Sequence, residues 1–144
     1  MKGDPSNPTD WRRVAERDLA SARRCLDQSD LPLAVFCLEQ AAEKALKSWL
    51  IGRGWALIKT HDLQRLINEC ACQGMDLSRF ESSARRLQSL YFTDRYVDDS
   101  PDPEPDAVEV TALLAAVERL FAHLFPAPPF APDPGNPSDG VGSV

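Results

Sequence analysis

The sequence predicts an all-α protein, an antiparallel up-and-down bundle of four to five helices. Apolar residues recur at intervals of three and four along most of the chain, the spacing that places them on one face of a helix. No segment alternates apolar and polar residues in the manner of a strand. The segment 34–51, AVFCLEQAAEKALKSWLI, is apolar on nearly every side, so we expect it to be the central helix, covered by its neighbours.

Length and composition indicate one domain. The 144 residues are 43% hydrophobic and 26% charged, as in globular proteins, and no apolar run approaches the roughly 20 residues of a membrane span. The start of the chain carries no export signal, so we expect a cytoplasmic protein without disulfides and without a membrane partner. We expect a disordered leader at 1–9, a helical domain at 10–125 and a disordered tail rich in proline and glycine at 126–144.

The net charge of −6 argues against broad binding to a nucleic-acid backbone, which requires an extended cationic surface. The charge is unevenly distributed, because most of the local acidity lies at 98–109. A local basic surface therefore remains on the first predicted helix, which carries Arg12, Arg13, Arg17, Arg23 and Arg24.

The four cysteines do not predict a metal centre. Cys70 and Cys72 form a C-x-C pair, but on a helix their side chains point about 200° apart. No second pair of Cys or His residues occurs at a metal-binding spacing. The sequence therefore predicts no metal ligands.

Helix boundaries follow from capping residues and from glycine and proline. Gly52 and Gly54 are expected to end the second helix, and Gly74 the third. The expected N-caps are Thr9 or Asp10, Asp30, Thr60, Asp76 or Ser78, and Asp106, the last with Glu109 as a capping box. The five helices are expected at about 10–28, 31–52, 61–73, 76–94 and 106–124.

Four features follow one another along these predicted helices. They are Trp11 with Leu19, the run QAAEKALK at 40–47, the run KTHDL at 59–63, and Tyr91 followed by Arg95 and Tyr96. In this order and spacing, over about residues 10–124, they resemble the HEPN domain (higher eukaryotes and prokaryotes nucleotide-binding), in its small stand-alone bacterial or archaeal form.

The resemblance implies an all-helical bundle that commonly forms a homodimer. HEPN domains are often encoded beside, or fused to, a small nucleotidyltransferase, in pairs similar to toxin–antitoxin systems. Some members are endoribonucleases and others have lost that activity. For this chain the resemblance implies a nucleotide as the ligand, and a nucleotidyltransferase as a partner.

The chain departs from the ribonuclease members in one important respect. Those members carry an Arg, four to six intervening residues and a His, whereas here only Arg53 with His61 and Arg119 with His123 are near that spacing. In addition, Cys37, Glu39 and Val97 replace residues that are common in the family. The sequence therefore favours a protein that is not a metal-independent ribonuclease of the usual HEPN kind.

The best candidate site is a cationic groove between the polar stripe of the second predicted helix (39, 40, 43, 44 and 47) and the segment after the fourth. Lysines at 44 and 47 are neighbours on a helix, and the first amide groups of the third helix add partial positive charge that suits phosphate. The expected ligand-binding residues are Lys44, Lys47, Lys59, His61, Arg95 and Tyr96, supported by Gln40, Glu43, Asp62 and Tyr91.

Each candidate also has a structural interpretation. The polar stripe could be a solvated face, with Glu43 and Lys47 as an ordinary surface ion pair. His61 lies where its ring can cap or pack a first helical turn, and His123 lies where it can pair with a helix dipole. The position of Arg95, just before a proline-rich segment, gives little structural reason for an arginine. Its guanidinium fork suits phosphate or carboxylate.

Three functions therefore stay open. The first is a homodimeric binding module for a nucleotide, another anionic ligand or a nucleotidyltransferase. The second is an endoribonuclease with a non-standard active site built on Arg119 and His123, and only this alternative requires RNA. The third is a purely structural dimerisation domain.

Overall fold

A computed structural model of the chain describes residues 3–95 and 104–127, with the backbone alone at 92–95. These ranges contain five α-helices, one short 3-10 helix and no strand, which confirms the predicted fold class. The elements are α1 (Pro8–Asp27), α2 (Leu31–Gly52), α3 (Leu63–Cys72), η1 (Ser78–Phe80), α4 (Glu81–Arg95) and α5 (Ala107–Leu124).

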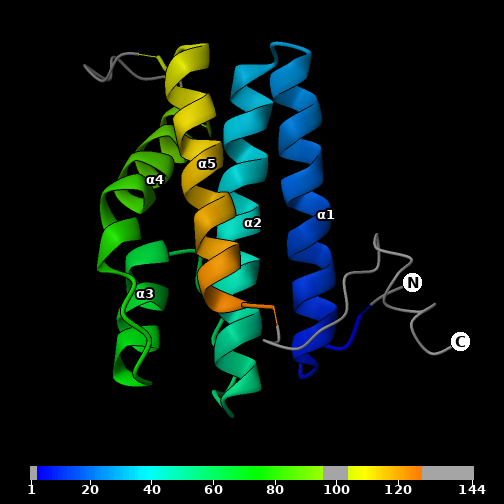
Figure 1. Cartoon of the computed structure of the whole chain (residues 1–144), viewed down its shortest axis with the longest axis vertical. Coiled ribbons are helices and arrows are strands. Elements are labelled where there is room, and N and C mark those ends of the chain that lie inside the picture. The colour runs from blue at the N-terminus through cyan, green and yellow to red at the C-terminus, as the bar shows by residue number, and fades with distance from the viewer. Residues whose placement is uncertain (1–2, 96–103, 128–144) are drawn as a thin grey trace, which may run out of the picture.

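The long helices run up and down, and α2 is the central one (Figure 1). It packs against α1 on one side, against α3 and α4 on the other, and against α5. Its apolar residues make up the middle of the core because they are covered on all of these sides. Side chains with no exposed surface include Leu38, Leu46 and Leu50 of α2, Leu63 and Leu66 of α3, Leu87 of α4, and Val110 and Val117 of α5.

Three of the predicted N-caps differ from those in the structure. The fourth predicted helix, expected to be capped by Asp76 or Ser78, opens with η1, whose N-cap Leu77 makes no side-chain hydrogen bond. Asn7, not Thr9 or Asp10, caps α1, because Pro8 fits the first turn and the Asn7 side chain accepts the Thr9 amide proton at 2.9 Å. Asp62 replaces Thr60 as the cap of α3, accepting from the amides of the next turn. The Thr60 hydroxyl accepts the Asp62 amide proton instead, just outside the helix.

Residues 3–7, which belong to the predicted leader, are hydrogen-bonded to α1. The Trp11 Nε1–H donates to the Pro5 carbonyl at 2.8 Å, and the Asp4 amide donates to Asp10 Oδ2 at 2.8 Å. These bonds fix the entry to α1 from its first turn. The predicted tail from 128 and the segment 96–103 lie outside the described residues.

The caps of α2 and α5 are those predicted, Asp30 and Asp106. The capping box of α5 forms only in part, because the Asp106 carboxylate accepts the Glu109 amide while the Glu109 side chain turns to α4. There it receives two hydrogen bonds from Arg86, at 2.8 and 2.9 Å. This bidentate pair ties α5 to α4. Within the described ranges no helix is long and apolar enough to cross a membrane.

Candidate functional site

Most of the predicted polar stripe of α2 is inside the protein, although Gln40 and Lys44 are only half-buried. Glu39, Glu43 and Lys47 keep only 0%, 3% and 4% of their surface exposed. The interpretation of this stripe as a solvated face is therefore wrong, and so is that of Glu43 and Lys47 as a surface ion pair. The reason is tertiary: α1 and the segment before α3 cover this side of α2, which a helical projection of α2 alone does not show.

The centre of the stripe is a chain of three charged or titratable groups. Lys47 Nζ lies 3.0 Å from Glu43 Oε2, and His61 Nδ1 lies 2.8 Å from Glu43 Oε1. The Lys47 ammonium also lies over the ring of Trp11, 5.4 Å from its centroid. Glu43 thus joins the two runs that carry the family resemblance, QAAEKALK and KTHDL.

Lys44 is also paired inside the chain. Its Nζ lies 2.6 Å from Asp18 Oδ2 of α1, and both side chains are largely buried. The positive charges of Lys44 and Lys47 are therefore each matched by a carboxylate. The two lysines do not form the open cationic surface that the sequence predicts, because α1 contributes an acid opposite one and α2 supplies an acid one turn from the other.

Glu39 is the least satisfied group of the stripe. Gln40 Nε2 donates to Glu39 Oε2 at 2.8 Å, whereas Glu39 Oε1 is buried without a hydrogen-bond partner among the described residues. Burial, followed by the charge of Glu43, raises the pKa of Glu39 from 4.5 to about 7. A carboxyl group in this state takes up a proton near neutral pH.

His61 is anchored at one nitrogen and open at the other. Its side chain is 70% exposed although Nδ1 lies against the buried Glu43. A carboxylate only accepts hydrogen bonds, so His61 carries a proton on Nδ1 that it donates to Glu43, while most of its ring stays in solvent. The predicted role of His61 in capping the third helix is taken by Asp62.

The start of α3 does not offer free amides for phosphate. The Leu63 amide donates to Gln88 Oε1 at 2.7 Å, and the amides of Gln64 and Arg65 donate to Asp62 Oδ1. The expectation that these amides bind an anion is therefore wrong, because the cap and α4 already occupy them.

The other predicted residues of the groove are only partly described. Lys59 is exposed near His61 in the chain, and Tyr91 is buried with its ring stacked on Phe36 at 5.9 Å. Arg95 is the last residue of α4, and only its backbone is described. Tyr96 lies outside the described residues. The groove as a whole thus stays a prediction, without the charges of Lys44 and Lys47.

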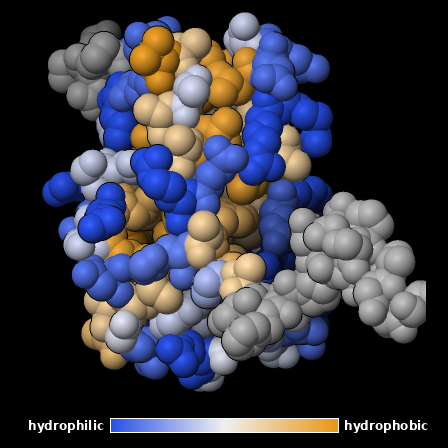
Figure 2. Space-filling view, in the orientation of Figure 1, coloured by the Kyte–Doolittle hydropathy of each residue, from blue (hydrophilic) through white to orange (hydrophobic). Residues whose placement is uncertain are grey.

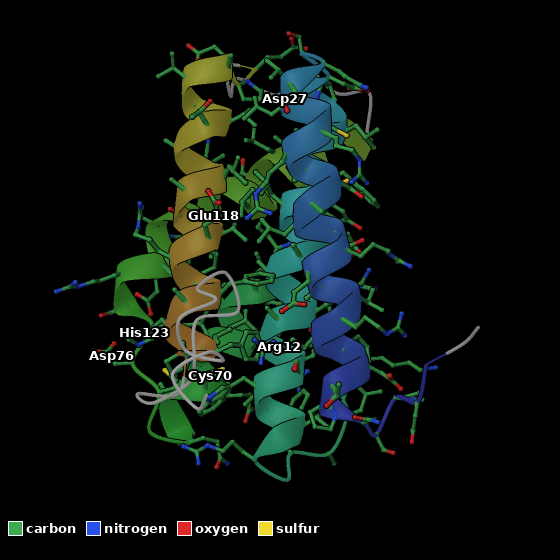
Figure 3. The ribbon with its side chains drawn as sticks, turned by 45° about the vertical axis from the view of Figure 1, so that its right-hand side comes forward. Arg12, Asp27, Cys70, Asp76, Glu118 and His123 are labelled. Atoms are coloured by element: carbon green, nitrogen blue, oxygen red, sulfur yellow. The ribbon has the colours of Figure 1, made fainter. Side chains whose placement is uncertain are left out.

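A different place has the shape of a ligand site. A cleft of about 560 Å³ lies between α5 and the turn that joins α3 to α4, and we call it the α5 cleft. Figure 3 shows His123 and Asp76 close to each other there, at the C-terminal end of α5. The lining residues are Asp76, Leu77, Ser78, Arg79, Phe80, Ala116, Arg119, Leu120 and His123.

The α5 cleft has an apolar floor and a polar rim that carries two arginines. Leu77, Phe80 and Leu120 are buried beneath it, whereas Arg79, Arg119 and His123 are exposed. In the described part of the chain neither arginine forms an ion pair.

Asp76, the acidic residue of the α5 cleft, accepts a hydrogen bond from the Ser78 amide two residues later. Hydrogen bonds from the backbone and the hydroxyl of Ser78 lower the pKa of Asp76, and the nearby His123 and Arg79 lower it further. Asp76 thus stays ionised beside His123. The sequence indicated Arg119 and His123 but not Arg79 or Phe80, because only the fold brings η1 to α5.

Two of the four cysteines are poorly suited to chemistry. Burial raises the pKa of Cys37 to about 11 and that of Cys70 to about 12, so both thiols stay protonated at neutral pH. Among the described residues no group of three or more His, Cys, Asp or Glu side chains could hold a metal ion.

The fold and the two signature runs joined at Glu43 define a small all-α bundle domain. The sequence model of the HEPN domain matches residues 9–124, and the chain belongs to this family. Two solved structures are similar in fold. The crystal structure of TT1696 from Thermus thermophilus has 25% identity and a TM-score of 0.68, covering 81% of this chain and 94% of that one.

The second structure is that of ST0689, described as an archaeal HEPN homologue. It has 25% identity and a TM-score of 0.66, covering 86% of this chain and 96% of that chain. No curated protein matches the sequence closely enough to count as a relative. Sequence and structure thus agree on the family and on the fold.

Proposed function

We propose that this HEPN domain is a binding module for a nucleotide, which it holds in the α5 cleft. The observation that carries the proposal is a pair of arginines, Arg79 and Arg119, that face a concave apolar floor without an ion pair in the described part of the chain. A guanidinium fork matches phosphate geometry, so an unpaired arginine at a cleft favours a phosphate-bearing ligand.

The rest of the cleft fits the other parts of a nucleotide. Its volume of about 560 Å³ lies within the usual range of small-molecule sites. Phe80 and Leu120 close the floor of the cleft with an apolar layer beneath the ligand, and His123 adds a titratable donor at its rim. A compact anion suits a chain of net charge −6 better than a long nucleic acid does.

Calorimetric titration with nucleoside triphosphates tests this proposal. We expect Arg119→Gln and Arg79→Gln each to weaken binding about ten-fold or more, because each removes charge-assisted hydrogen bonds. Arg24→Gln removes the same charge from an exposed position on α1 and serves as the matched control. Full affinity in both cleft variants would contradict the proposal.

The predicted groove is tested in the same titration by Lys44→Ala and Arg95→Ala. Lys44 is paired with Asp18, so we expect little change in affinity from its loss. A large loss in Arg95→Ala together with full binding in Arg119→Gln would place the ligand at Lys59, His61, Arg95 and Tyr96 instead.

An endoribonuclease is the second candidate function. Arg119, His123 and Asp76 line the same cleft. Arg119 supplies a cation, His123 an acid–base group, and Asp76 a carboxylate that can orient the histidine. The test is cleavage of a mixed RNA substrate by stringently purified protein. Turnover that disappears in His123→Ala but survives in His61→Ala would establish this function.

We also propose that the domain forms a homodimer and pairs with a small nucleotidyltransferase. Apolar side chains remain exposed where α2 and α5 begin, namely Leu33, Phe36 and Val108, of which Val108 is 79% exposed. Figure 2 shows apolar surface gathered at that end of the bundle. Light scattering at tens of micromolar measures the dimer, and a pull-down with a candidate nucleotidyltransferase measures the partner. A monomer, or no capture, would overturn the respective proposal.

A further inference from the structure

We propose a second anion site, on the other side of the C-terminal end of α5, that binds the phosphoryl group of a small phosphate ester or diphosphate. It is a cleft of about 320 Å³ between the first turn of α1 and the last turn of α2, and we call it the α1–α2 cleft. It shares no lining residue with the α5 cleft. Arg12, labelled in Figure 3, comes from α1, and Arg53 directly follows α2.

Both arginines are held in place by aromatic rings. The guanidinium carbon of Arg12 lies 4.5 Å from the centroid of Phe125, and that of Arg53 lies 4.8 Å from the centroid of Trp49. All four of these residues line the cleft. Stacking on a ring occupies the face of a guanidinium and leaves its N–H donors at the edge, so these arginines are ordered yet still able to bind an anion.

The donors of the two arginines are mostly unused. Arg12 donates its Nε–H to Glu16 Oε1 at 3.0 Å. Its two terminal NH₂ groups stay available as donors to an anion. Arg53 forms no ion pair in the part of the chain that the structure describes. Two guanidinium groups that face one cleft match the several oxygens of a phosphoryl group.

The lining of the α1–α2 cleft also favours an anion. None of its lining residues is acidic, and Thr9 adds a hydroxyl group. The anion would be bound by side chains rather than by the start of α1, because the Thr9 amide already donates to the Asn7 side chain. The α1–α2 cleft therefore differs from the predicted groove, in which each buried lysine faces a carboxylate.

Position, not the lack of an acid, sets Arg12 apart from the other arginines of α1. Arg12 pairs with Glu16, as Arg23 pairs with Glu118 and Arg13 with Asp10, but among the α1 arginines Arg12 alone lines this cleft. The basic character of the first helix that the sequence indicates is thus mostly matched by nearby acids. Only at its first turn does it reach a cleft that has no acidic lining.

The fluorescence of Trp49 gives a readout confined to this cleft, because Trp11 and Trp55 do not line it. We expect inorganic diphosphate and inorganic phosphate to change the emission of the full chain, through Arg53 above the indole. The change should disappear in Trp49→Phe. Arg53→Gln and Arg12→Gln should each weaken the titrated affinity about ten-fold or more, and Arg24→Gln should leave it unchanged.

Arg119→Gln separates this site from the proposed nucleotide site. It should keep the diphosphate response of Trp49 while losing nucleotide affinity, so the two proposals can fail independently. Circular dichroism and a urea transition check that each variant is folded, and the calorimetric affinity of Trp49→Phe for diphosphate checks that binding persists without the signal. No fluorescence change in the full chain, or unchanged affinity in both Arg53→Gln and Arg12→Gln, would overturn the inference.

Discussion

The polar stripe of α2 and the α5 cleft use similar side chains in opposite ways. In the stripe, Lys47 and Glu43 are nearly inaccessible and satisfy each other. In the α5 cleft, Arg79 and Arg119 are exposed and have no ion pair in the described chain. Buried charges of the stripe are matched by partners inside the chain, whereas the two arginines around the apolar hollow stay exposed to solvent.

The largest effect should follow from removing one charge of the stripe. Lys47→Met leaves Glu43 buried without its ammonium partner, so the free energy of unfolding should fall by about 3–5 kcal/mol. Urea denaturation measures it. The double variant Glu43→Gln with Lys47→Met removes both charges and should recover most of the loss. A loss below about 0.5 kcal/mol in the single variant would mean that the stripe is solvated.

Glu39 should make stability depend on pH. Its pKa is raised from 4.5 to about 7 in the fold, so the native state binds the proton more tightly than the unfolded chain. The contribution is therefore fully present below about pH 4.5 and is lost as pH rises through 7, by on the order of 3 kcal/mol. The glutamine in the variant Glu39→Gln stays neutral, so the stability of this variant relative to the natural chain should rise between pH 5 and pH 8. A stability difference that is flat with pH would contradict this.

His61→Ala should have a smaller effect. It removes the hydrogen bond to the buried Glu43 Oε1, but the ring is exposed and water can reach its place. The expected loss is about 1 kcal/mol. The control is Lys59→Ala, two residues earlier and exposed, which should not change the urea midpoint. If both variants behave alike, the His61 contact adds nothing to the fold.

The smallest effect on stability belongs to the α5 cleft. Arg119→Ala removes a positive charge, as Lys47→Met does, but no ion pair, so the free energy of unfolding should change by no more than about 0.5 kcal/mol. The same variant should lose nucleotide affinity. A strongly destabilised Arg119→Ala would show that this arginine has a structural role and would remove the contrast with the stripe.

Local signals in the sequence were enough for the helices. Proline, glycine and acidic caps act within one turn, so the start of α2 at Asp30 and that of α5 at Asp106 followed directly from them. The caps of α1 and α3 were wrong by two or three residues because several capping residues stand close together there. Choosing among neighbouring caps depends on the hydrogen bonds that the flanking chain makes, as Asn7 and Asp62 show.

The sequence by itself determined the all-α class, the central position of α2 and the membership of the HEPN family, because periodicity and signature runs are properties of neighbouring residues. Only the tertiary structure decided which charged side chains are paired with a partner inside the chain. Asp18 lies 26 positions before Lys44 and is its partner, and His61 lies 18 positions after Glu43 and binds it. Burial and ion pairing depend on which helices meet, so the two clefts that arginines line became visible only once α5 was packed beside η1 and the end of α2 beside α1.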